Sequence, residues 1–186
     1  MYALNWMPGR VLTAMAAVAL AMSAAPATAS IETPEAKAEA SDAALMAGFH
    51  MEEVFGAKRP KPGQYLWRKG SFEGEPRVVV GLSDQLAYLY RGADLVAVAS
   101  ISTGTDDHPT PKGIFEVRLK KTMHRSIKYD NAPMPFMQQI DKYGTALHAG
   151  HNPGYPASHG CIRLPSEFAK RLYAITDVGA TVMIGA

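Results

Sequence analysis

Short β-rich runs separated by turn residues dominate the chain from residue 76 onward, and they constrain the fold more than any other feature. Residues 77–81 are β-branched and end at a glycine, and residues 95–102 are apolar on both faces, as expected for a central strand. Between these runs, Leu86, Tyr88 and Tyr90 share one face, and residues 91–94 read as a hairpin turn. Residues 114–119 alternate between apolar and charged side chains. The spacing predicts a mainly β domain, a β-sandwich or a rolled sheet, with one or two short helices.

One of those helices is predicted over residues 166–175. Ser166 can cap its start, and Phe168, Leu172, Tyr173 and Ile175 form an apolar stripe. Asp177-Val178-Gly179 then predicts a turn into a last strand over residues 181–184.

The first 29 residues have the features of an export signal. Arg10 is the only charged residue before Glu32, residues 11–21 are apolar and rich in alanine, and Ala27-Thr28-Ala29 forms a small-x-small cleavage site. We expect cleavage after Ala29 and a location in the periplasm or cell envelope. The alternative is an uncleaved membrane anchor, although the apolar run is short for a spanning helix.

Residues 30–75 are predicted to be a linker and N-terminal extension, with the globular domain over residues 76–186. Residues 31–40 are rich in Ala, Glu and Lys, which predicts disorder or a frayed helix, and residues 43–55 can form a short amphipathic helix. Trp67 could stack on a sugar, but packing against the domain is the favoured interpretation.

The only cysteine of the chain, Cys161, lies in the sequence Pro-Ala-Ser-His-Gly-Cys-Ile-Arg-Leu-Pro. A single cysteine excludes an internal disulfide and leaves either a free reactive thiol or half of an intermolecular bridge. His159 stands two residues before it, and His148 and His151 lie upstream. Since an imidazole can generate or stabilise a thiolate, the block favours a nucleophilic cysteine, with any of the three histidines as its base.

Nucleophilic attack on a carbonyl also needs donors for the developing oxyanion, and the backbone amides of Gly160 and Cys161 are candidates. Arg163 would point to the same side as Cys161 in an extended segment and could bind a substrate carboxylate, or else form a structural ion pair. We expect the Ser158 hydroxyl to bond within the turn, with help in orienting an imidazole or contact with substrate as further roles.

Charge excludes one class of partner and leaves another open. A formal net charge of +2, together with export, argues against nucleic acid. Lys112, Arg118, Lys120, Lys121, Arg125 and Lys128 form a basic run broken only by Glu116, which either attracts an anionic polymer or is merely solvated. Asp106, Asp107 and His108 suggest a solvated turn more than a metal site, because prolines follow directly.

Several landmarks in order carry a family resemblance. Leu147-His148-Ala149-Gly150 followed by Ser158-His159-Gly160-Cys161-Ile162-Arg163, with Ser102-Thr103-Gly104 and Thr110-Pro111-Lys112-Gly113 upstream, resembles the signature of the L,D-transpeptidase (YkuD) family of bacterial cell-wall enzymes. The resemblance covers roughly residues 76–184. It implies the catalytic-domain fold of that family, no cofactor or metal, and a substrate cleft capped by the long loop expected over residues 123–137.

The resemblance also assigns roles. It implies that Cys161 is the nucleophile, that His148 is the general base, and that His159 supports the turn and its hydrogen bonds. His151 has no assigned counterpart. The implied reaction is thioester formation on a peptidoglycan stem peptide with loss of D-alanine, then transfer to an amine of a second stem or of an outer-membrane or wall-anchored protein. The same site could act as a carboxypeptidase or cleave such links.

Only nine residues separate His148 from Ser158, fewer than the family usually has, which bears on substrate choice. Arg163 stands where some members have asparagine. Two non-catalytic interpretations remain: zinc bound by His148, His151, His159 and Cys161, or a wall-binding module that has lost activity.

Overall fold

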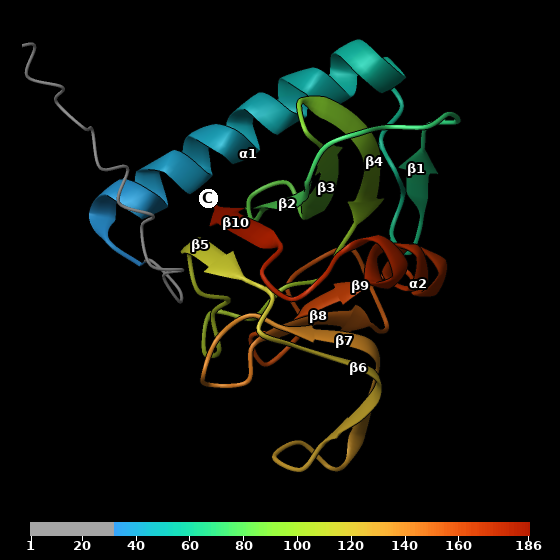
Figure 1. The fold of residues 1–186 in the computed structure, drawn as a ribbon. Helices are drawn as coiled ribbons and strands as arrows, with labels where there is room; N and C mark the ends of the chain where they lie inside the picture. The colour runs from blue at the N-terminus through green and yellow to red at the C-terminus, as the bar shows by residue number, and fades with distance from the viewer. Residues whose placement is uncertain (1–31) are drawn as a thin grey trace, which may run out of the picture.

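The computed structural model describes residues 32–186, which form two β-sheets and two helices (Figure 1). The predicted export signal lies outside the described residues. The predicted fold class, mainly β with two sheets, is confirmed. None of the helices within residues 32–186 combines the length and apolar character needed to cross a bilayer.

The larger sheet has six strands in the order β1-β4-β3-β2-β10-β5. Their bounds are β1 Tyr65–Trp67, β2 Pro76–Gly81, β3 Leu86–Arg91, β4 Asp94–Ser100, β5 Gly113–Glu116 and β10 Thr181–Gly185. β10, the last strand, lies between β2, to which it is parallel, and β5, to which it is antiparallel. The hairpin turn predicted over residues 91–94 joins β3 to β4 through a two-residue loop, and Gly92 adopts a positive φ there.

The smaller sheet has four strands in the order β6-β7-β8-β9. They are β6 Leu119–Ser126, β7 Ala132–Gln139, β8 Ala146–Ala149 and β9 Ile162–Leu164. The prediction of a long loop over residues 123–137 was wrong, because β6 and β7 pair as a continuous antiparallel hairpin. In Figure 1 this hairpin extends away from the rest of the molecule.

Helix α1 (Pro34–Phe55) covers the outer face of the larger sheet, where it packs on β10 and β2 (Figure 1). The sequence predicted disorder or fraying over its first turns, and this was wrong. Pro34 occupies the first turn, Thr33 caps it by accepting from the Ala36 amide, and one face of small side chains is buried. These are Ala36, Ala40, Ala44, Ala47 and Met51.

Helix α2 (Ser166–Ile175) has the predicted bounds and buries Phe168 and Leu172. The predicted Ser166 cap was wrong, since Pro165 occupies the cap position without a side-chain hydrogen bond. At its other end, Lys120 from the basic run donates to the carbonyls of Tyr173 and Thr176, which satisfies free helix carbonyls. Trp67 packs against Phe168 at 5.9 Å between ring centroids, as its packing interpretation expected.

Candidate active site

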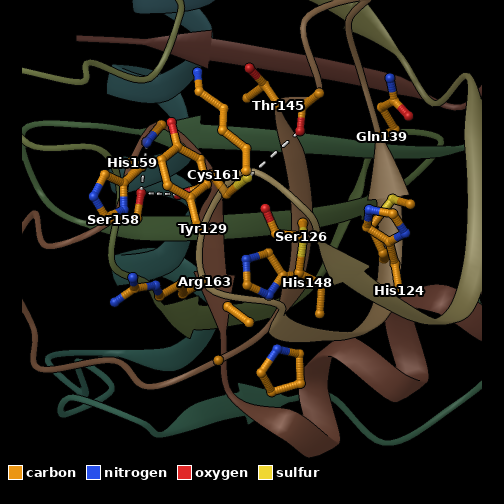
Figure 2. A pocket seen from close by; sticks show the side chains of 18 of the residues that line it. His124, Ser126, Tyr129, Gln139, Thr145, His148, Ser158, His159, Cys161 and Arg163 are labelled. Carbon is orange, nitrogen blue, oxygen red and sulfur yellow. Dashed lines mark hydrogen bonds between the residues drawn. The ribbon is translucent and has the colours of Figure 1, made fainter.

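One open cavity of about 1250 Å³ lies against the smaller sheet. It is lined by every histidine that the sequence proposed as a base, together with Cys161 and Arg163. Figure 2 labels His148, His159, Cys161 and Arg163 among them. His108 and His124 also line it, so five of the six histidines in the chain face one space. The residues singled out from the sequence are therefore brought together, although they come from separate strands and loops.

The parallel pair of β8 and β9 orients the central residues. His148 lies directly opposite Arg163 in the register, so both side chains project from the same face. Ile162 and Leu164 on β9 point the other way and are fully buried. Cys161 immediately precedes β9 and is two residues before Arg163, so its side chain shares the Arg163 face. This is the arrangement expected for an extended segment after the turn.

His148 is held with one ring nitrogen engaged. Its Nδ1 lies 2.9 Å from the Ala149 carbonyl oxygen, and because a carbonyl only accepts, Nδ1 must donate. The neutral ring therefore carries its lone pair on Nε2. Burial lowers the pKa of His148 below its ordinary value, Arg163 lowers it further, and the bond to Ala149 opposes both. The imidazole is thus a neutral proton acceptor at neutral pH.

Cys161 is half-buried and packs beside Met134, Met137 and Ala146. Its sulfur lies 3.8 Å from the Gly144 carbonyl oxygen. Burial raises the pKa of the Cys161 thiol, and the negative charge of Asp141 raises it further. The backbone hydrogen bond from Ala146 and the positive charge of Arg163 lower this pKa, but burial outweighs them. The resting pair is therefore a neutral thiol and a neutral imidazole.

The turn before Cys161 is held by the Ser158 hydroxyl. This hydroxyl donates to the Cys161 carbonyl at 2.5 Å and accepts from the Gly160 amide at 3.1 Å. Gly160 has a φ of 106°, which only glycine adopts readily. Ser158 therefore bonds within the turn as expected, and its hydroxyl is already engaged, which argues against the substrate-binding role. The Gly160 amide is also engaged, so Cys161 supplies the better oxyanion donor of the predicted two.

Arg163 is fixed through its backbone while its guanidinium remains uncommitted. Its amide donates to the Ser102 carbonyl at 2.9 Å, and the Ser102 amide donates back at 3.1 Å. Within residues 32–186 the ion pairs are Arg59–Asp84 and Arg68–Asp94, and neither involves Arg163. The alternative of a structural ion pair is thus not realised, and the guanidinium can meet a carboxylate in the cavity.

His159 is exposed and lies between two other rings. It stacks on Tyr129 at 4.3 Å between centroids and meets His108 edge-on at 4.9 Å. Figure 2 shows Tyr129 and His159 side by side next to Ser158. The expected hydrogen-bond support of the turn comes from Ser158, whereas His159 joins the turn to two neighbouring loops by ring contacts. His151 is exposed at the cavity rim.

The region expected to cap the cleft, residues 123–137, does line the cavity, but as the β6–β7 hairpin and not as the predicted loop. Its cavity-lining side chains include His124, Tyr129, Met134 and Met137. Lysines and arginines between the apolar positions of β6 concealed the strand pattern, because most of this strand is exposed on both faces. Strand β7 contains Pro133 and Pro135, which also obscured it.

The zinc interpretation needs four ligands to converge. Within the described part of the chain, no three His, Cys, Asp or Glu side chains are grouped so that they could hold a metal ion. His159 is instead stacked between two rings, and His148 already donates through Nδ1. Asp106 and Asp107 lie exposed in a turn.

The chain is similar to known proteins both in sequence and in structure. The family model for the L,D-transpeptidase catalytic domain (YkuD) matches residues 75–184. A search of curated proteins found no match.

Three solved structures illustrate the fold similarity. An L,D-transpeptidase from Mycobacterium smegmatis has a TM-score of 0.56 at 18% identity, over 60% of this chain and 59% of that one. One from Stackebrandtia nassauensis has a TM-score of 0.56 at 23% identity, over 75% and 64%. L,D-transpeptidase 3 from Mycobacterium tuberculosis, in complex with a faropenem-derived adduct, has a TM-score of 0.54 at 22% identity, over 60% and 61%. The chain thus spans about three-fifths of the length of these proteins.

Proposed function

This chain belongs to the L,D-transpeptidase catalytic domain family, and from that premise we propose that it forms a thioester between Cys161 and a peptidoglycan stem peptide and passes the acyl group to an amine. The observation that carries the proposal is the shared face of β8 and β9, which presents a thiol, an imidazole with a free Nε2 and an unpaired guanidinium to one cavity.

The first half of the reaction breaks the peptide bond to the terminal D-alanine. As Cys161 Sγ bonds to the carbonyl carbon, its proton moves to His148 Nε2, and the carbonyl electrons move onto oxygen. We assign the Cys161 amide to that oxyanion. When the oxyanion collapses, the bond from carbon to nitrogen breaks, and His148 returns its proton to the nitrogen of the departing D-alanine. The products are the thioester and free D-alanine.

The neutral resting pair has a consequence for this step. A neutral thiol is weakly nucleophilic, so deprotonation of Cys161 must accompany the approach of a carbonyl rather than precede it. His148 suits this role, because its lowered pKa keeps Nε2 unprotonated at neutral pH. Until a substrate fills the cavity, the Cys161 sulfur therefore reacts only slowly with other electrophiles.

Arg163 supplies the substrate contact that we propose. The donor stem peptide carries carboxylates, and a guanidinium binds a carboxylate through two parallel hydrogen bonds. Lys128 also lines the cavity, and Asp130 is its only lining acid within the described residues. This charge balance favours an anionic peptide.

The second half reverses the first with a different amine. An acceptor nitrogen attacks the thioester carbon, loses a proton to His148, and displaces Cys161 as its thiol. With a second stem the product is a cross-link, and with a protein amine it is a protein attached to the wall. If water attacks instead, the same site is a carboxypeptidase or a hydrolase. The substrate is outside the cytoplasm, so the proposal also requires export, which the signal predicted at residues 1–29 would direct.

A β-lactam tests the nucleophile and the class of reaction together. The purified protein should gain the mass of a faropenem-derived adduct on the peptide containing Cys161, and should release D-alanine from a tetrapeptide stem. Cys161→Ala should do neither, while its melting temperature stays within a few degrees of the parent, since the thiol is only half-buried.

Two results would sink the proposal. Absence of any adduct on the folded parent protein would leave a wall-binding module as the better interpretation. A large loss of stability in Cys161→Ala would make the thiol a packing residue. Mass analysis of wall fragments after digestion would then separate the acceptors, since cross-linked, trimmed and protein-bearing stems differ in mass.

A further inference from the structure

The motif that joins β4 to β5 has no part in the reaction as described so far. It consists of Ser102-Thr103-Gly104 and, after an exposed turn, Thr110-Pro111-Lys112-Gly113. In the fold this segment lies against the back of the turn that carries Cys161. Gly104 forms a β-bridge with Ser158, and the Thr105 amide donates to the Ser158 carbonyl at 3.1 Å.

Within this segment, the Thr110 side chain contacts the residue that directly precedes the nucleophile. Its side chain is buried, with 5% of its surface exposed, and its Oγ1 has two partners. It accepts from the Gly104 amide at 2.9 Å and lies 2.9 Å from the Gly160 carbonyl oxygen. Because the amide must donate and the carbonyl must accept, the single hydroxyl proton of Thr110 points at the Gly160 oxygen.

That carbonyl belongs to the peptide that links Gly160 to Cys161. A peptide unit is planar and trans, so its C=O and its N–H point in opposite directions along one plane. Fixing the Gly160 oxygen therefore fixes the direction of the Cys161 N–H. A hydrogen bond to the oxygen also polarises the peptide and makes its N–H a stronger donor. The next peptide is held in the same way, by the Ser158 hydroxyl on the Cys161 carbonyl.

The surroundings leave Thr110 little freedom to move. Pro111 restricts the backbone of Thr110, which directly precedes it, and the β-branched side chain of Thr110 has few rotamers. The bonded Gly104 is also confined. A Cβ at that position would come within 2.0 Å of the His108 oxygen and 2.9 Å of the Gly160 Cα. The Thr110 hydroxyl is thus held in one position by neighbours that cannot easily move.

We propose that Thr110 is a positioning residue that aims the Cys161 amide at the oxyanion formed during acyl transfer. The inference rests on the proposed function, because only attack at a carbonyl creates that oxyanion. It gives the Thr-Pro-Lys-Gly segment a part in catalysis, although Thr110 touches neither the substrate nor the sulfur.

Two reactions of the same sulfur separate this role from a merely structural one. In acylation by faropenem, Sγ bonds to the lactam carbonyl carbon, the thiol proton goes to His148, and the carbonyl oxygen becomes an oxyanion before the lactam C–N bond breaks. In alkylation by iodoacetamide, Sγ displaces iodide from a saturated carbon, and no oxyanion forms. A misaimed amide should therefore slow the first reaction and spare the second.

The test compares Thr110→Val, which keeps the shape but loses the hydroxyl, with Thr110→Ser, which keeps the hydroxyl. Thr110→Val should be acylated about ten- to a hundredfold more slowly, since loss of an entire oxyanion donor costs about 10²–10³. Its alkylation rate should stay within about twofold of the parent. Thr110→Ser should recover most of the acylation rate. Both rates come from time courses of intact mass.

Thr103→Val is the matched control. Thr103 lies in the same segment, is also buried, and accepts from Gln85 at 2.7 Å. Its variant should change neither rate by more than about twofold. Equal slowing of acylation and alkylation in Thr110→Val, or selective slowing of acylation in Thr103→Val as well, would overturn the inference. So would an unchanged acylation rate in Thr110→Val. A parent protein that forms no adduct would instead refute the proposed function on which the inference depends.

Discussion

The two sheets of this molecule are built from the same kinds of strands but differ in how they are covered. In the larger sheet, β2, β3 and β4 are buried along nearly their whole length, between α1 on one side and the core shared with α2 on the other. In the smaller sheet, β6 is mostly exposed, and the face of β8 and β9 toward the cavity carries His148 and Arg163.

Each sheet contains one parallel pair, and the two pairs show the contrast most clearly. β2 and β10 pair along the whole of β10 and are apolar beyond the first pair, Arg77 and Thr181. Parallel strands are usually covered on both faces, which suits that pair. β8 and β9 form a short pair that is apolar on one face and opens to the cavity on the other. The larger sheet therefore supplies stability, while the smaller sheet carries chemically reactive groups on a well-anchored edge.

The largest expected effect is a loss of acylation rate caused by a substitution in the smaller sheet. His148→Gln should lower the rate of acylation by faropenem about 10²–10⁴-fold, because the general base is lost. Its melting temperature should change little, since the ring is bonded only to a neighbouring carbonyl. The control is His151→Gln, which removes an exposed histidine from the same cavity and should keep most of the activity. A reversal of these two results would make His151 the base.

A second prediction concerns pH. The pKa of the Cys161 thiol is raised above its ordinary value of 9.0 by burial, so the thiolate fraction grows about tenfold per pH unit in the neutral range. Alkylation by iodoacetamide should therefore rise about a hundredfold between pH 7 and pH 9 without levelling off.

Acylation should behave differently, because it depends on His148. Burial lowers the pKa of His148 below its ordinary value of 6.5, so the loss of acylation on acidification should set in at a lower pH than for an ordinary histidine. An alkylation rate that levels off below pH 8 would indicate a preformed thiolate and would contradict the neutral resting pair.

The smallest expected effect on the reactivity of Cys161 comes from a substitution in the larger sheet. A Cβ at Gly185 in β10 would lie 2.3 Å from the Ala40 carbonyl oxygen and 2.5 Å from the Ser41 Cα of α1. Gly185→Val should therefore lower the free energy of unfolding by about 3 kcal/mol, as measured by urea denaturation. Below its melting transition, the alkylation rate of Cys161 should be unchanged. If that rate also falls sharply, the two sheets are not separable in the way described.

Gly48→Ala, in the helix that packs against Gly185, provides the matched control. Its Cβ would meet only the Tyr88 hydroxyl oxygen, at an ordinary 3.8 Å. Replacing a helix-interior glycine with alanine there should raise the free energy of unfolding by up to about 1 kcal/mol.

Most of the larger sheet was predictable from sequence, because its strands obey the simplest rule. The alternation of Leu86, Tyr88 and Tyr90 assigned one face of β3, and these three side chains do pack together, against α1. The bounds of α2 followed from its apolar stripe. Its cap was misassigned because the helix begins at Ser166 itself, so that the cap position falls one residue earlier, on Pro165.

The length of α1 was missed for a physical reason. Its buried face is made of alanines, which carry little hydrophobicity and so give no strong periodic signal. They are buried because their small size lets the helix backbone approach β10 closely, at the glycine that ends that strand. The pattern of Ala36, Ala40, Ala44 and Ala47 was visible, but it indicates close packing only when a partner surface is known.

The candidate site was predictable in its chemistry and less so in its surroundings. The grouping of thiol, imidazole and guanidinium follows from local sequence and register, which β8 and β9 realise. The stacking of His159 on Tyr129 and the bond from Thr110 to Gly160 join segments far apart in the chain. Neither leaves a trace in local sequence patterns, because each depends on how whole loops meet.

The place of β10 also governs when the molecule can become complete. This strand comes last among the described elements, yet it separates β2 from β5 and lies beneath α1 (Figure 1). Until β10 is in place, β5 has no neighbouring strand in its sheet, and α1 lacks the strand on which it mainly packs. The larger sheet therefore cannot close until β10, the last of its strands in sequence, is available to pair with β2 and β5.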